Sequence, residues 1–253
     1  MFNKIKRALF LLSLLLLAVI ISACGNKIDY ANIDAKEYLS AAQKSMESPQ
    51  SLTVKYVSRL KMSKAGEKTD TESISTIDII LEPAAKIRYA VQQLEHSANK
   101  TEVTQESLEY YYTEGGKYYV VSKTGEKTQH EEIGKEDFEK KLFNLNAITV
   151  IEKGIEDAKL VSAQKYNGKD VLLFEAAVAI GDEDTVGNNK PNTKYSYYID
   201  EQTKELVGYI IDVTDMLNEQ LPADSSPENQ IEECIIECTI HNLNKVNDFD
   251  IPQ

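Results

Sequence analysis

The side chains best suited to catalysis are few and scattered in this sequence. The three histidines, His96, His130 and His241, each lie in a polar stretch or at the expected edge of a strand. No G-x-S-x-G, H-E-x-x-H or phosphate-binding glycine motif is present to join a nucleophile, a metal or a phosphate to its activating groups. The sequence therefore predicts a protein that is not an enzyme and uses no cofactor. An envelope hydrolase is the weakest alternative, because no nucleophile is paired with a base.

One acidic loop has part of the spacing of a calcium site. In "DEDTVGNNKPNT", Asp182, Asp184 and Gly187 take offsets one, three and six of a calcium-binding loop. Val186 and Thr193 stand at offsets five and twelve, where a ligand and a bidentate glutamate are needed. We therefore expect a solvated loop without a metal.

Two of the three cysteines share one expected strand. The alternation in "ECIIECTI" places Cys234 and Cys238 on the same face as Ile236 and Ile240. In a strand the two cysteines would lie about 13 Å apart, too far for a disulfide. The pattern predicts buried free thiols, with a helical pair or a redox switch as the alternatives.

The third cysteine, Cys24, follows a leader-like segment. Three basic residues precede an apolar run over residues 8–21, which as a helix of about 21 Å is too short for a hydrocarbon core of about 30 Å. Its length is typical of a secretory signal peptide. The letters "ISAC" at 21–24 then resemble the bacterial lipobox, and the resemblance implies that Cys24 carries a diacylglycerol after cleavage before it. The alternative is an uncleaved anchor with an incidental cysteine.

This resemblance implies the organisation and location of the chain. We expect a lipoprotein signal peptide at 1–23, a lipidated tether at 24–33 and one folded domain at 34–253. The acyl chains at Cys24, palmitate among them, would hold the domain at the extracytoplasmic face of the cell membrane.

Charge excludes one class of partner. Removal of residues 1–23, with three basic and no acidic residues, would take the net charge from −13 to −16. Such a chain lacks the basic surface that nucleic acid requires. Anionic headgroups would also repel it, so the lipid rather than a basic patch must hold it at the membrane.

The elements expected to position these residues are mostly strands. A helix is expected from Asp34 to Met46, and a second from Glu136 to about Asn146. Asn167-Gly168 between apolar runs predicts a hairpin. The other expected strands, by their period-two alternation, lie at about 51–62, 77–81, 86–91, 108–122, 158–179, 193–216 and 231–240.

The order of these elements resembles a known family. The lipobox, the short helix, the hairpins "YNGKD" and "YYIDEQTKELVGY" and the ending "NKVNDFDIP" follow one another as in an uncharacterised family of Gram-positive surface lipoproteins. That family is similar in turn to the LolA, LolB and LppX lipid carriers. The resemblance implies an α+β fold in which a strongly curved antiparallel β-sheet, a half-barrel, wraps around a few helices.

A curved sheet with one apolar face and few helices would leave an apolar hollow. We expect this hollow to bind a lipid or a lipoprotein acyl chain, for transport or sensing. The alternative is a protein-interaction or envelope-sensing module with a filled core, whose partner is an envelope protein. The residues expected to line the hollow are Val54, Tyr56, Ile79, Tyr89, Val91 and Leu142.

The tyrosine clusters have a second interpretation. Tyr110 to Tyr112 and Tyr195 to Tyr198 could stack on envelope sugars, but neighbours in a strand point to opposite faces. Each cluster is therefore expected to divide between the core and the surface, which favours sheet packing.

Overall fold

The structure is a computed structural model of the whole chain. It describes residues 30–47, 49–64, 67–97, 100–125, 127–143, 151, 155–179, 192–219, 221 and 230–252. Residues 1–34 and 35–253 form two units, and the first contains the short 3-10 helix η1 (Tyr30–Asn32). Cys24, the apolar leader and Asp182 to Gly187 lie outside the described residues. Among the described helices, none is both long and apolar enough to cross a bilayer.

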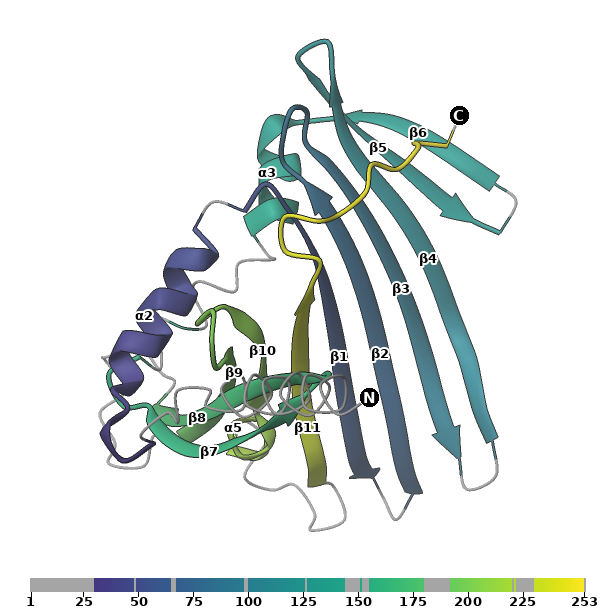
Figure 1. Cartoon of the computed structure of the whole chain (residues 1–253). Coiled ribbons are helices and arrows are strands. Elements are labelled where there is room, and N and C mark those ends of the chain that lie inside the picture. Colours follow the sequence, from purple (N-terminus) through teal and green to yellow (C-terminus); the bar gives the residue numbers. More distant parts are fainter. Residues whose placement is uncertain are drawn as a thin grey trace, which may run out of the picture. The chain divides into compact units, whose positions relative to one another are not determined.

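The second unit is built on one antiparallel sheet of eleven strands, in the order β6-β5-β4-β3-β2-β1-β11-β10-β9-β8-β7. The chain meanders outward from β1 to β6 and then returns from the far edge, so that β11 pairs with β1 (Figure 1). The strands are β1 (Ser51–Lys64), β2 (Glu67–Ile80), β3 (Lys86–Ser97), β4 (Lys100–Glu114), β5 (Lys117–Thr124), β6 (Lys127–Ile133), β7 (Lys159–Tyr166), β8 (Lys169–Ala179), β9 (Asn192–Asp200), β10 (Leu206–Asp212) and β11 (Gln230–His241).

Three short helices accompany the sheet in the part of the chain that the structure describes. Helix α2 (Ala35–Ser45) contacts β9 and β10, α3 (Lys135–Phe143) contacts β5, and α5 (Thr214–Glu219) contacts β11 and β9. Helix α2 buries one stripe, which is the 3.6-residue pattern of an amphipathic helix. The stripe consists of Tyr38, Leu39 and Ala42, with Met46 following the helix.

The fold class differs from the prediction in its helix content and its curvature. The described chain is mostly β rather than α+β, and the sheet is neither strongly curled nor closed, with β6 and β7 as two separate edges. Strong curling needs bulges and glycine kinks. Strands β1 and β2 instead pair without a register shift from Ser51 to Lys64, the β1–β11 and β3–β4 ladders have one shift each, and β1 to β4 contain no glycine. The half-barrel prediction was therefore wrong in this respect.

The two faces of the sheet are covered differently. On the helix face, the ring of Tyr38 in α2 lies 5.7 Å from that of Phe174 in β8, and Phe138 in α3 lies 5.2 Å from Tyr118 in β5. On the opposite face, here called the tail face, residues 242–252 run across the ends of the first strands. The ring of Phe249 lies 6.3 Å from Tyr110, beneath the guanidinium of Arg88.

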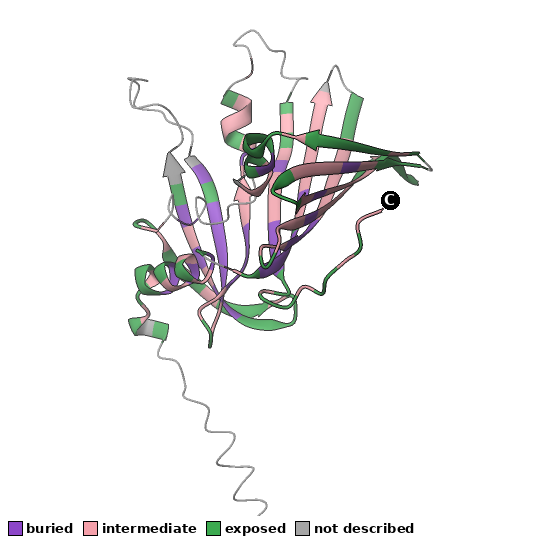
Figure 2. Ribbon diagram, turned by 90° about the horizontal axis from the view of Figure 1, so that it is seen from above, coloured by how far each residue is buried: buried purple, intermediate pink, exposed green. Residues whose placement is uncertain are grey.

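Burial follows this arrangement. Buried residues are concentrated in β1 and in β8 to β11 (Figure 2), whereas β6 and the outer ends of the long strands are exposed. Cys234 and Cys238 are buried free thiols, as predicted. The first tyrosine cluster divides between the two faces, with Tyr111 on the helix face and its neighbour Tyr110 on the tail face. The second cluster does not divide between core and surface, because Tyr195, Tyr197 and Tyr198 are all buried.

Candidate ligand-binding site

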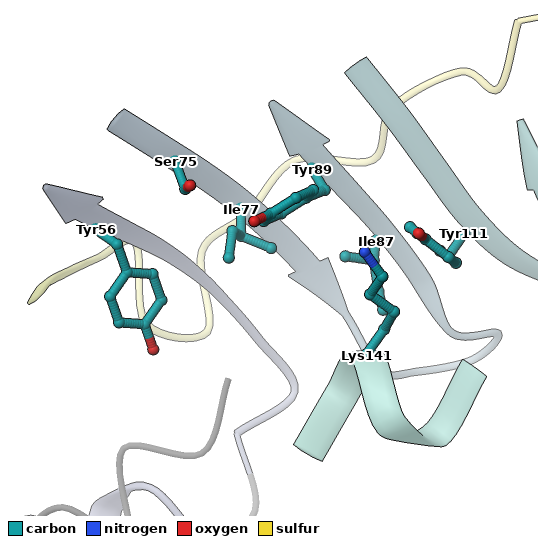
Figure 3. A pocket seen from close by; sticks show the side chains of 7 residues that line it. All are labelled: Tyr56, Ser75, Ile77, Ile87, Tyr89, Tyr111 and Lys141. Atoms are coloured by element: carbon teal, nitrogen blue, oxygen red, sulfur yellow. The ribbon is translucent and has the colours of Figure 1, made fainter. Parts of the chain in front are cut away.

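A hollow of about 270 Å³ lies on the helix face, where β1 to β4 pass below α3. Its apolar lining comes from Ile77 in β2 and Ile87 in β3, each of which is 1% exposed. In the β2–β3 ladder, Ile77 pairs with Tyr89 and Ile87 pairs with Ile79. Figure 3 shows the side chains that line it. The full lining is Tyr56, Ser75, Ile77, Ile87, Tyr89, Tyr111 and Lys141.

Strand alternation explains why these residues meet. Ser75 and Ile77 are two apart in β2, and Ile87 and Tyr89 are two apart in β3, so each pair shares a face. Tyr111 pairs directly with Ile87 across β3 and β4. The antiparallel register therefore gathers residues from four strands into one surface.

One charged cluster borders the hollow. The Lys141 ammonium lies 4.8 Å from the ring centroid of Tyr89 and 4.9 Å from that of Tyr111. Its Nζ atom is also 3.3 Å from Oε2 of Glu109. The same Glu109 oxygen accepts a hydrogen bond of 2.6 Å from the Tyr111 hydroxyl. Lys141 thus sits between two ring faces and a carboxylate.

The protonation states of this cluster follow from its surroundings. Burial, with the hydrogen bond to Glu109, raises the pKa of Tyr111 to about 12, so the phenol is neutral at pH 7. Burial alone would lower the pKa of Lys141, but hydrogen bonding and charge interactions with Tyr111 and Glu109 raise it on balance. Lys141 is therefore a cation.

Tyr56, which lines the hollow on the β11 side, belongs to a hydrogen-bonded group of three side chains. Tyr56, Tyr209 and Cys238 share side-chain hydrogen bonds, and burial raises the pKa of both phenols. Burial also raises the pKa of the Cys238 thiol to about 12. Because the thiolate is the nucleophilic form, this cysteine is inert at neutral pH.

The six residues predicted to bind a ligand do not all lie at one site. Tyr56 and Tyr89 line the hollow. Val54 and Ile79 share its face but are buried in the core, at 1% and 3% exposed. Leu142 is half-buried beside Lys141 and does not line the hollow, while Val91 lies at a different hollow described below. Ligand binding by any of them remains a prediction.

Five lining residues were missed from the sequence. Ile77 and Ile87 lie on the predicted apolar faces, so alternation was the signal that could have found them. Tyr111 lies within three consecutive tyrosines, where alternation alone does not say which ring faces inward. Ser75 and Lys141 are polar, so a pattern of apolar residues does not identify them.

A second hollow lies among β2, β3 and β4, with a volume of about 380 Å³. Its lining is more polar and includes Gln92, Glu106 and Lys123. The Gln92 amide already donates a hydrogen bond of 2.7 Å to Glu106. Two of the polar groups here thus already pair with each other.

Metal ligands do not gather in the described part of the chain: no group of three or more His, Cys, Asp or Glu residues is placed to hold an ion there. In the calcium-like loop, only the last positions are described, and Thr193 is fully buried in β9.

Comparisons with known proteins identify structures but no sequence family. No protein-family model matches the sequence, and no curated protein matches it. The chain is similar to LprF from Mycobacterium bovis, at 12% identity and a TM-score of 0.45, over 87% of this chain and 96% of that one. It is also similar to a putative outer membrane lipoprotein-sorting protein domain from Vibrio parahaemolyticus, at 10% identity and a TM-score of 0.24, over 82% and 93%. A LolA superfamily protein from Nitrosomonas europaea matches at 9% identity and a TM-score of 0.24, over 86% and 96%.

Proposed function

We propose that this protein is a membrane-anchored, extracytoplasmic lipoprotein that binds one acyl chain in the hollow below α3, for transport or sensing, and catalyses no reaction. The observation that carries the proposal is the hollow itself, lined by Ile77, Ile87 and three tyrosine rings. The anchor would be a diacylglycerol on Cys24, and the partners would be a membrane lipid or the acyl chain of another lipoprotein.

The volume supports a single chain as the ligand. At about 270 Å³ the hollow is just below the range of about 300–1,000 Å³ for sites that enclose drug-sized ligands. It has room for roughly nine groups of the size of water, at about 30 Å³ each. One acyl segment fits that space, whereas a complete two-chain lipid does not.

The chemistry of the lining supports an apolar ligand. Each methylene transferred from water to an apolar wall contributes about 0.8 kcal/mol. Isoleucine side chains and ring faces offer such a wall without demanding hydrogen bonds. Two polar groups of the lining, the Tyr111 hydroxyl and the Lys141 ammonium, are already paired with Glu109.

Native mass spectrometry of residues 27–253, which keep the whole second unit, tests the proposal. We expect a single-chain lipid to copurify. Ser75→Phe should abolish this copurification, because the ring would project into the hollow. Ser73→Phe is the matched control, since Ser73 lies two residues earlier on the same face of β2 and outside the hollow. An empty wild-type protein, or equal lipid in both variants, would count against the proposal.

One observation favours the alternative of a protein-interaction module. The β8 to β10 half of the helix face is filled, with Leu39, Phe174 and Tyr197 fully buried beneath or beside α2. A half filled in this way by described side chains would act through its surface. Cross-linking in intact cells separates the two functions, because it would recover one partner protein while the purified protein carried no lipid.

A further inference from the structure

We propose that Tyr89, Tyr111 and Glu109 form a binding site for an ammonium group at the edge of the hollow, and that Lys141 occupies this site as a tethered competitor. The ligand class is a single-chain amphiphile that carries a substituted ammonium head. The inference rests on the proposed function, since the acyl chain would lie in the hollow and the head in this site.

The geometry is that of a cation site. Two aromatic faces lie within 5 Å of the same ammonium, at 4.8 and 4.9 Å. Cations are held over tyrosine rings within about 6 Å of the centroid, and groups of such rings bind quaternary ammonium ligands. Glu109 adds a carboxylate at 3.3 Å, which completes the charge balance.

The surroundings favour a cation over an anion. Glu109 faces the site and would repel a second carboxylate. The chain as a whole carries a net charge of −13, so its field attracts cations and repels anions.

Lys141 is able to leave the site without unfolding of α3. Its side chain is 39% exposed, and its four flexible methylenes allow the ammonium to turn toward solvent. Phe138 anchors the helix separately, at 2% exposed, against Tyr118. A ligand ammonium would then replace the lysine ammonium on the same three groups.

The test uses the full chain in nanodiscs of phosphatidylglycerol, a lipid without an ammonium, with empty nanodiscs as the blank. Isothermal titration calorimetry compares three probes with one chain length: hexyltrimethylammonium, hexanol and hexanoate. Lys141→Met removes the competitor but keeps the apolar stem. We expect it to strengthen binding of hexyltrimethylammonium on the order of tenfold, with hexanol unchanged.

Two further variants define the site. Glu109→Gln should weaken binding of the ammonium probe in the Lys141→Met background, because the carboxylate is lost while the shape is kept. Lys140→Met is the matched control, since Lys140 pairs with Glu136 on the exposed side of α3, and it should change nothing. Lys141→Gln serves as a second opening variant if the methionine variant does not fold.

The outcomes separate this inference from the proposed function. If hexanol binds but the ammonium probe binds no better in either Lys141 variant, the cation site is wrong and the hollow stands. If hexanoate binds the wild type and is lost in Lys141→Met, Lys141 anchors an anion, which also overturns the cation site. If none of the probes binds any variant, the proposed function fails as well.

Discussion

Gly208 in β10 is the position where one methyl group tests the packing of the sheet most directly. A Cβ atom at Gly208 would overlap the carbonyl oxygen of Cys238 and would lie 3.1 Å from Cε1 and 3.2 Å from the hydroxyl oxygen of Tyr166. The Tyr166 ring is stacked on Tyr198 at 3.9 Å, and its hydroxyl donates a hydrogen bond of 2.8 Å to Glu237. The ring therefore closes over the bare backbone of Gly208.

Gly208→Ala is expected to lower the free energy of unfolding by an amount near the upper end of the range for overpacked cores. Extra methyl groups in a packed core cost about 1–3 kcal/mol. The Cys238 carbonyl belongs to β11, and the β10–β11 ladder pairs Gly208 with Thr239. The carbonyl therefore cannot move away from an added methyl group without disturbing that ladder. We expect a loss of about 2–3 kcal/mol in the free energy of unfolding and, for a domain of this size, a Tm lower by about 4–12 °C.

Urea unfolding of residues 27–253, followed by circular dichroism, measures this loss. Gly134→Ala is the control, because a Cβ there would meet only Asp137, at 3.5 Å, and should change stability little. The Tyr166→Leu background separates the two obstacles. Most of the alanine penalty should persist there, since the carbonyl remains. A penalty that vanished in that background, or that never appeared, would refute the packing described for β10 and β11.

Three further predictions concern the helix, the thiols and the phenol at the site. Phe138→Ala should detach α3 from the sheet, since Phe138 is its buried anchor, and should lower the local free energy of unfolding by about 3–5 kcal/mol. Hydrogen exchange would then show residues 135–143 unprotected, and unchanged protection would contradict this. Cys238 should resist iodoacetamide in the folded protein at pH 8, because its pKa of about 12 leaves little thiolate, and mass spectrometry should find it labelled only after unfolding; rapid labelling of the folded protein would refute its burial. The raised pKa of Tyr111 stabilises the fold fully below about pH 10, the ordinary phenol pKa, and this contribution is lost as the pH rises toward 12. Tyr111→Phe should therefore reduce the loss of stability between these two pH values, measured by urea unfolding at each pH. An identical pH dependence in both proteins would contradict the assignment.

The sequence determined most of the strands through alternation of apolar and polar residues. In β1, Leu52, Val54 and Tyr56 alternate with polar residues, and the strand begins and ends within two residues of the expected range. The helix from Ala35 to Ser45 was also predicted, because its apolar residues recur at helical spacing. These features depend on local periodicity, which is present in the chain before any tertiary contact forms.

Elements without that periodicity escaped prediction. Strand β6 (Lys127–Ile133) is an exposed edge, so neither of its faces needs to be apolar. The outer ends of β3 and β4 are exposed for the same reason. In the sequence, the short helix α5 looks like a continuation of β10. In the structure, Thr214 Oγ1 accepts a hydrogen bond from the backbone N–H of Cys234.

Curvature and the binding site were decided by the tertiary structure alone. Alternation specifies which residues share a face but not how far a long sheet bends, since that depends on bulges and on what packs against the face. The sequence therefore placed Tyr56 and Tyr89 on the correct face, whereas Lys141 reaches Tyr89 only because α3 folds back over strands that are distant in the chain. Local periodicity determines the elements of this protein, and long-range packing determines where space and charge meet.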